Sequence, residues 1–324
     1  MRAFPLMCGL LSALTLGASG CGGDTANREQ PASGAAAAGR TASGNATAEE
    51  VAEEQRGRLR CPAKTVAAPS GTPAHDIQGV RPGMRLADAG PLVLCSHPLL
   101  VATSDSSNRF NLETHGVRLV QGYSASFARP RVERSSKEIL ADMQQAAMDR
   151  GNNRVKREVM PGEMAWTLGV MGMPGDEVVT DVAREEWYAA GQEPAVSSVE
   201  EALVTKYGTP TFTQRSDQQQ LLRWAYLPSG ARVQDQPGYT TCSTNPFRNS
   251  PVNYTDACGI VVEVVIQSLP SNPALAQATQ LRSVNQVAAV ARITATAEQL
   301  QQRELARRNA QLNDAKKRGV APTF

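Results

Sequence analysis

The sequence predicts an α+β fold, with an antiparallel sheet that carries helices on one face and a long C-terminal helix after it. Three observations support this prediction. Short runs of alternating or β-branched apolar residues recur along the chain and are separated by Pro and Gly turns, as in antiparallel sheets. Capped segments with apolar residues at helical spacing interrupt these runs. The segment 271–324 then carries one extended helical stripe that fades into charged residues.

The N-terminal segment has the layout of an export signal. Arg2 precedes an apolar run over 3–16, which is too short to span a bilayer as a helix. The following Ala18-Ser19-Gly20 fits ordinary signal cleavage, and together with Cys21 it resembles the lipobox of bacterial lipoproteins. We therefore expect a signal peptide over 1–20 and a lipid on Cys21 that anchors the chain to the membrane. Ordinary secretion is the alternative.

Residues 21–60 are expected to be a disordered tether. Residues 22–50 contain no Val, Ile, Leu, Met or aromatic residue, and Ala, Gly, Ser and Thr dominate. This composition buries too little surface to offset the entropy of ordering, and it suits a flexible spacer between a lipid and a domain. Gly22 after the cysteine resembles lipoproteins sent to the outer membrane. The expected location is the periplasmic side of that membrane, with a soluble periplasmic or secreted protein as the alternative.

The rest of the chain has room for one large domain or two small ones, expected over 61–270. The 33 Lys and Arg nearly balance the 31 Asp and Glu, so charge gives no basis for nucleic-acid binding. Four cysteines remain after the signal peptide and Cys21, and an even number in an exported chain is typical of disulfides, here two. They are Cys61, Cys95, Cys242 and Cys258. We expect the pair Cys242–Cys258, because the polar loop between them has little else to hold it, and the pair Cys61–Cys95.

The domain divides into two possible helix-plus-sheet units, 75–190 and 195–270. The first predicts a short apolar helix before Cys95, a strand over 116–127, a helix from the capping box Ser135–Glu138 to Gly151, and strands over 164–173 and 177–188. The second predicts a helix that ends at Gly208, a strand over 222–226 and a β-branched strand over 259–266, in which Glu263 requires a partner or a sheet edge. Asn272 and Pro273 then predict the start of the C-terminal helix.

Two stretches carry a resemblance. GVRPGMRLADAG at 79–90 and VEEALVTKYGTPTFTQ followed by RWAY, within 199–226, resemble small outer-membrane assembly lipoproteins of the SmpA/OmlA type and the related fold of β-lactamase-inhibitor proteins. The resemblance implies helices laid on an antiparallel sheet, sometimes in tandem. It also implies a protein that binds other proteins and does not catalyse a reaction.

No catalytic or metal-binding pattern is evident in the sequence. The Gly-x-Ser-x-Gly motif of serine hydrolases and a phosphate-binding glycine loop after a strand are both missing. Cys95-Ser96-His97 suggests a metal site with His75 and His115, but neither a short Cys-x-x-Cys nor a His-x-x-x-His spacing occurs. We therefore expect no metal ion and no cofactor.

Aromatic residues are the candidate contacts for a protein partner. Three tryptophans fall on predicted strands, where they are either core residues or an exposed patch that anchors an interface. Three further aromatics lie in or beside the loop that the Cys242–Cys258 pair closes, which would suit insertion into a partner's cleft. The candidate interaction residues are Trp166, Trp187, Trp224, Tyr239, Phe247 and Tyr254.

Together, these observations predict a lipid-anchored protein of the bacterial cell envelope that acts through contacts with another protein, of unknown identity, and is not an enzyme. An inhibitor or immunity-like partner of a hydrolase or toxin, secreted or periplasmic, is the first alternative. A periplasmic enzyme of unrecognised family is the second.

Overall fold

The computed structural model describes residues 44–57, 59, 61, 71–105, 110–151, 158–234 and 241–319. The expected signal peptide, the lipid site Cys21 and the candidate interaction residue Tyr239 lie outside these residues. None of the described helices is long and apolar enough to cross a membrane.

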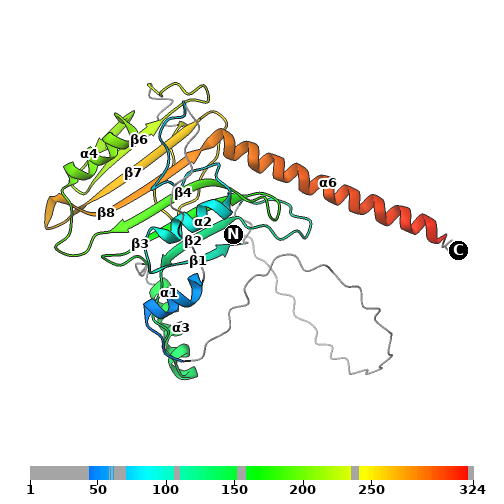
Figure 1. The fold of residues 1–324 in the computed structure, drawn as a ribbon, viewed down its shortest axis with the longest axis horizontal. Coiled ribbons are helices and arrows are strands. Elements are labelled where there is room, and N and C mark those ends of the chain that lie inside the picture. The colour runs from blue at the N-terminus through cyan, green and yellow to red at the C-terminus, as the bar shows by residue number, and fades with distance from the viewer. Residues whose placement is uncertain are drawn as a thin grey trace, which may run out of the picture. The chain divides into compact units, whose positions relative to one another are not determined.

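One eight-stranded antiparallel sheet, in the order β1-β2-β3-β4-β8-β7-β6-β5, organises the described residues (Figure 1). The strands are β1 (Leu100–Asp105), β2 (Gly122–Phe127), β3 (Met164–Met171), β4 (Val178–Trp187), β5 (Phe212–Arg215), β6 (Gln219–Ala225), β7 (Ile260–Leu269) and β8 (Asn272–Asn285). The helices are α1 (Ala48–Arg56), α2 (Leu86–Cys95), α3 (Ser136–Gly151), α4 (Val196–Tyr207) and α6 (Gln286–Arg318). The predicted α+β class, with an antiparallel sheet and a long C-terminal helix, is confirmed.

The sheet consists of two units with the same order of elements. In the first unit α2 is followed by β1 to β4, and in the second α4 is followed by β5 to β8. Each set of four strands is an antiparallel meander, and the two meanders join where β4 pairs with β8, with Val182 opposite Ser283. A single sheet therefore runs through both units, and the second unit ends at Asn285 rather than at residue 270.

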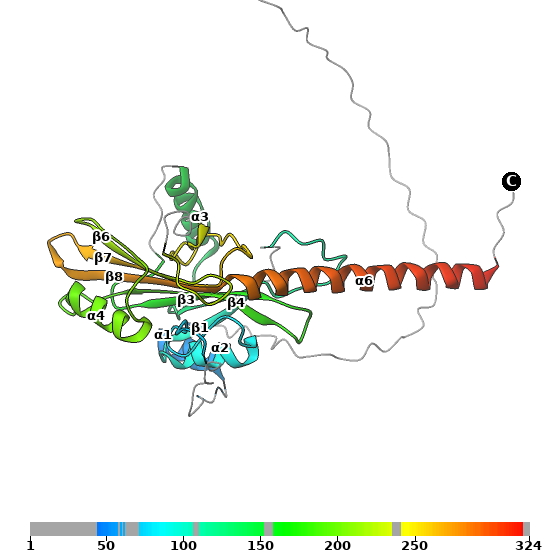
Figure 2. The ribbon, with the colours of Figure 1, turned by 90° about the horizontal axis from the view of Figure 1, so that it is seen from above.

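The two faces of the sheet are covered differently. Helices α1, α2 and α4 lie on one face, called the helix face below, whereas α3 and the segment 241–258 lie on the other, called the loop face (Figure 2). The main core fills the space between the helix face and its helices, and Trp166, Leu222 and Trp224 are among its fully buried side chains. Burial of apolar surface on this face is the main source of the fold's stability.

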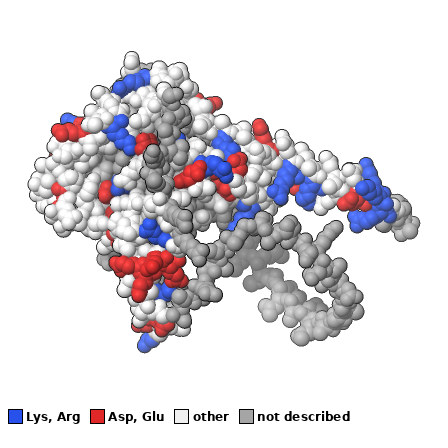
Figure 3. Space-filling model, viewed as in Figure 1, with Lys and Arg blue, Asp and Glu red and all other residues white. Residues whose placement is uncertain are grey.

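Part of the segment expected to be a tether is helix α1. Thr47 and Glu50 form a capping box, in which each side chain accepts a hydrogen bond from the other's backbone N–H. Val51 and Ala52 are buried beside β1. The prediction of disorder over 21–60 is therefore wrong at this end, because the buried side chains of α1, the backbone pairing of Ala46 with Arg131 and the ion pair of Arg131 with Glu54 hold the segment on the domain. The glutamates of α1 form an acidic patch (Figure 3).

The start of the C-terminal helix is the second correction. Asn272 and Pro273 begin strand β8, and the helix begins only at Gln286. β8 lies between β4 and β7, which supply hydrogen-bond partners along both of its edges, and this tertiary pairing overrides the local helix signal. The true N-cap is Asn285, whose side-chain oxygen accepts a hydrogen bond from the backbone N–H of Ala288 at 3.2 Å.

Candidate interaction site

The segment 241–258, called the stapled loop below, lies across the loop face of the sheet (Figure 2). A disulfide between Cys242 and Cys258 closes it, and both cysteines are buried against side chains of β6 and β7. Cys61 and Cys95 form a second disulfide, between the end of the α1 region and the end of α2. Both predicted pairings are confirmed, and they fit an oxidising, extracytoplasmic compartment.

Arg282 of β8 anchors the middle of the stapled loop. Its guanidinium is fully buried and donates from Nη2 to the backbone carbonyl oxygens of Phe247, at 2.7 Å, and Arg248, at 3.1 Å. The same side chain forms an ion pair with Asp181 of β4, with Nη1 and Oδ1 3.5 Å apart. A loop without regular structure needs partners for its backbone carbonyls, and here a buried cation of the sheet supplies them.

Asp181 also holds the far side of the stapled loop. The hydroxyl of Tyr254 donates to Asp181 Oδ2 at 2.6 Å. On the neighbouring strand β3, Gly169 lies opposite Asp181, and a Cβ at that position would overlap the Asp181 carboxylate. Gly169 therefore makes room for the aspartate, so the backbone of β3 and the anchor of the loop are coupled.

Two further carboxylates complete the anchorage. Glu263 of β7 accepts hydrogen bonds from Arg223 Nε at 2.7 Å and from the backbone N–H of Thr244 at 3.1 Å. This is the partner that the sequence required for a glutamate within a β-branched strand. Arg248 of the loop donates to Glu158 at 2.5 Å, and hydrogen bonds from Asn249 and Arg248 lower the pKa of that carboxyl. Glu158 precedes β3, so the loop of the second unit is tied to the first unit.

This anchorage leaves one aromatic side chain at the surface beside a hollow. Phe247 is 39% exposed, although the carbonyls around it are fixed. Next to it, a cavity of about 630 Å³ opens between the stapled loop and strands β6 and β7, and Leu221, Val265 and Tyr254 are among the residues that line it. On the other side of the loop, Arg248 lines a cavity of about 740 Å³ together with Val159 and Met160. An exposed aromatic side chain on a fixed backbone, with a cavity on either side of the loop, can contact another protein without first becoming ordered.

The candidate aromatics of the strands do not contribute to this surface. Trp166 and Trp224 are completely buried in the core, and Trp187 is 8% exposed, so the hypothesis of an exposed tryptophan patch is wrong. The indole N–H of Trp224 donates to the carbonyl oxygen of Gly208 at 2.7 Å, which fixes the turn after α4. Of the candidate interaction residues, Phe247 and Tyr254 come together in the stapled loop.

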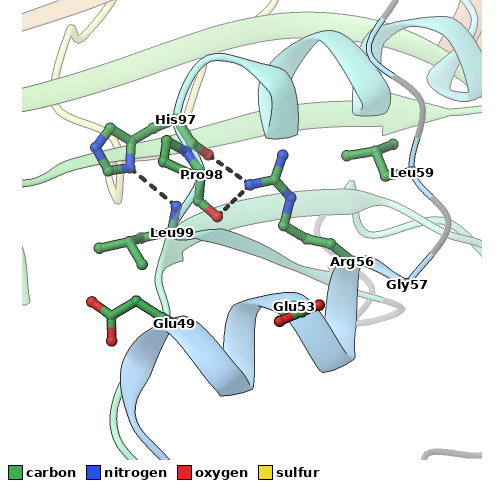
Figure 4. Close-up of a pocket in the computed structure, with 8 residues that line it drawn as sticks. All are labelled: Glu49, Glu53, Arg56, Gly57, Leu59, His97, Pro98 and Leu99. Atoms are coloured by element: carbon green, nitrogen blue, oxygen red, sulfur yellow. Dashed lines mark hydrogen bonds between the residues drawn. The ribbon is translucent and has the colours of Figure 1, made fainter.

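A third hollow lies on the other face of the sheet, between α1 and residues 97–99 (Figure 4). It has a volume of about 550 Å³, and Glu49 and Glu53 lie at its edge. Arg56 reaches across it and donates to the carbonyl oxygens of His97, at 3.3 Å, and of Pro98. Partial burial, together with the charge of Arg56, lowers the pKa of His97. None of the described residues that line the hollow is a serine, threonine or cysteine, so these residues include no nucleophile for the histidine to activate.

The three histidines do not meet. His75 is buried and its Nδ1 lies 2.8 Å from the carbonyl oxygen of Pro73, His97 stacks on Phe127, and His115 pairs with Glu113. Among the described residues, no group of three or more His, Cys, Asp or Glu side chains is placed to hold a metal ion.

Sequence reasoning missed three of the residues that hold the loop. It placed Arg282 on a helix and gave no role to Asp181 or Arg248. One signal was available. Asp181 and Glu185, which lies 3.6 Å from Arg248 Nε, are charged and four residues apart on a predicted strand, and side chains at even spacing share a face.

The chain matches no protein-family model, no curated protein and no solved structure.

Proposed function

We propose that the protein is a lipid-anchored, non-catalytic protein of the bacterial cell envelope that acts by contact with another protein through the stapled loop. The single observation that carries this proposal is the fixation of the loop around an exposed Phe247. Binding usually loses affinity when a loop must become ordered, and a disulfide and buried ion pairs remove that cost in advance. The proposed anchor is a lipid on Cys21, which rests on the sequence.

A second candidate function is that of an inhibitor-like partner of a hydrolase. The shape of the stapled loop favours this second function. The loop is short, closed by a disulfide, held by the sheet beneath it and exposes an aromatic side chain, so it can enter a concave cleft without a change of shape. The two functions share one surface and differ in the partner. The first implies a membrane component and the second a soluble enzyme.

The test is capture of partners from detergent-solubilised envelopes after chemical cross-linking. We compare the mature chain with Phe247→Ala and with the control Leu227→Ala. Both side chains are 39% exposed, and both lie in the connection between β6 and β7. A partner specific to the loop should lose at least about tenfold in yield with Phe247→Ala, because truncated aromatic anchors commonly cost more than about 1.4 kcal/mol. The control should retain that partner.

The identity of the retained protein separates the two candidate functions. A partner lost equally in both variants, or in neither, contradicts the loop as the binding surface. The intact mass of the mature chain from the membrane fraction tests the anchor, and it should correspond to a chain that begins at Cys21 and carries acyl groups. An unmodified chain in the soluble fraction would contradict the lipid anchor and leave the loop proposal to the capture experiment.

A further inference from the structure

Helix α3 exposes an apolar stripe that nothing in the described structure covers. Residues 136–148 are all exposed, and α3 makes no extensive contact with another described helix or strand. Ile139 and Leu140 are 48% and 56% exposed, and Met143 and Met148 are 64% and 63% exposed. Ile139, Leu140 and Met143 lie on one side of the helix, because residues three or four apart share a face. Apolar residues grouped in this way mark an interaction surface.

The second half of α6 is also without a partner among the described residues. From Leu305 to Gly319 every residue is exposed, and this part of the helix extends away from the sheet (Figure 1). Leu305 and Leu312 are 51% and 53% exposed, and their spacing of seven residues places them on one side of the helix. A helix of about 15 residues is only marginally stable by itself in water, so a packing partner would stabilise it.

The two helices are complementary in charge. Residues 305–318 contain five Lys and Arg and a single acidic residue, and blue side chains mark this part of α6 in Figure 3. Helix α3 contains three acidic and two basic residues. Asp142 and Asp149 follow one flank of its apolar stripe, about 10 Å apart along the axis, and Asp142 has an exposed ion pair with Arg134. Arg308 and Lys316 lie beside Leu305 and Leu312, about 12 Å apart, and Arg308 also contacts Glu304 of its own helix.

We propose that α3 of one molecule packs against the distal part of α6, residues 305–318, of a second copy of this chain. The leucines of α6 cover the apolar stripe of α3, and the basic residues face Asp142 and Asp149. Figures 1 and 2 show the two helices leaving the domain in different directions, so they do not meet within one molecule. Because each copy carries both helices, a two-fold dimer makes the contact twice.

Two other surfaces fit less well. The glutamates of α1 form a stronger acidic patch, but Val51 and Ala52 of that helix are buried, so α1 offers no apolar surface to Leu305 and Leu312. A membrane surface fits α3 poorly, because interfacial helices are rich in Lys and Arg on their polar face and α3 has a net negative charge.

Sedimentation of the mature chain in detergent, at low and high salt, tests the proposal. We expect association that weakens with salt, because the paired charges are exposed. Two double variants should each associate at least tenfold more weakly than the wild type. One reverses the charges of α3, Asp142→Lys with Asp149→Lys, and the other reverses those of α6, Arg308→Glu with Lys316→Glu. An equimolar mixture of the two variants should regain association, because every α3 then meets an α6 of opposite charge. The matched control is Glu49→Lys with Glu53→Lys on α1, which should associate as the wild type does.

A wild-type chain that stays monomeric overturns the proposal, as does a dimer that either reversal leaves unchanged. It is also overturned if the mixture fails to associate while circular dichroism shows both variants folded, or if the monomer instead binds phospholipid vesicles through α3. The proposal does not use the stapled loop. Phe247→Ala should therefore leave self-association intact, and the result is separate from that of the proposed function.

Discussion

The two units of the sheet differ most in the connection between their second and third strands. In the first unit this connection, residues 128–163, carries α3, and in the second unit the connection 226–259 contains the stapled loop. Both connections lie on the loop face (Figure 2). The stapled loop is fixed by a disulfide and by the buried charges of Arg282 and Glu263, whereas α3 stands exposed.

The difference shows how each connection provides hydrogen-bond partners for its backbone N–H and carbonyl groups. The stapled loop has little regular structure, so its carbonyls and N–H groups need charged side chains from the sheet below. In helix α3 the backbone groups bond to one another, and the predicted capping box supplies partners in the first turn. Glu138 N donates to Ser135 Oγ at 3.3 Å, and Ser135 N donates to the Glu138 carboxylate at 2.8 Å. We therefore expect the stability of the domain to depend more on the contacts of the stapled loop than on the side chains of α3.

Removal of Arg282 should have the largest effect. Arg282→Met leaves Asp181 buried without its cation and leaves the carbonyls of Phe247 and Arg248 without their donor. We expect a loss of about 3–5 kcal/mol in the free energy of unfolding, measured by urea denaturation. The control is Arg134→Met, whose ion pair with Asp142 is more than half exposed, and it should cost less than about 1 kcal/mol. Equal losses in the two variants would contradict the comparison.

Removal of the Cys242–Cys258 disulfide should lower the free energy of unfolding by less than removal of Arg282. The variant Cys242→Ser with Cys258→Ser releases a loop closed over a separation of 16 residues, for which chain entropy gives about 3 kcal/mol. Hydrogen exchange should increase in residues 241–258 and stay unchanged in α3. If the loop keeps its protection in this variant, the buried ion pairs alone hold it and the disulfide is dispensable.

A pair of glycine substitutions sharpens the comparison further. Gly169→Ala forces a Cβ into the Asp181 carboxylate beneath the stapled loop, and we expect a loss of about 1–3 kcal/mol. Gly151→Ala, at the end of α3, meets nothing within 4 Å. It should leave stability unchanged or raise it by less than about 1 kcal/mol, because alanine favours helix. Thermal unfolding of both variants is the measurement, and a destabilised Gly151→Ala would show contacts of α3 that the structure lacks.

The apolar stripe of α3 gives a smaller effect still. Ile139→Ser with Met143→Ser removes apolar groups that are about half exposed or more, so the free energy of unfolding of the monomer should change by less than about 1 kcal/mol. Urea denaturation at low protein concentration measures it. A large loss would mean that the stripe is part of the domain's own core.

Local signals made much of the fold predictable from the sequence. The capping box of α3, the strands on either side of Pro174 and both disulfides depend on neighbouring residues or on cysteine count, and these predictions are confirmed. Strand β8 was not predictable in this way, because its sequence favours a helix and only pairing with β4 and β7 makes it a strand. The pair of Arg282 and Asp181 was lost with it, since Arg282 meets Asp181 only when β8 lies beside β4.

The smallest expected effect on stability comes from Glu304 in α6, and it depends on pH. Hydrogen bonds from Arg307 and Arg308 lower the pKa of Glu304 to about 2, from about 4.5 in an unfolded chain. A lowered pKa means that the carboxylate stabilises the helix above about pH 4.5 and that this stabilisation is lost as the pH falls toward 2. NMR titration of the Glu304 carboxyl should therefore give a midpoint near 2, and Arg308→Gln should raise it. A midpoint near 4.5 in the wild type would show that the arginines do not hold Glu304. The distal part of α6 would then lack its own internal support and would depend even more on a partner, unlike α3, which has its capping box.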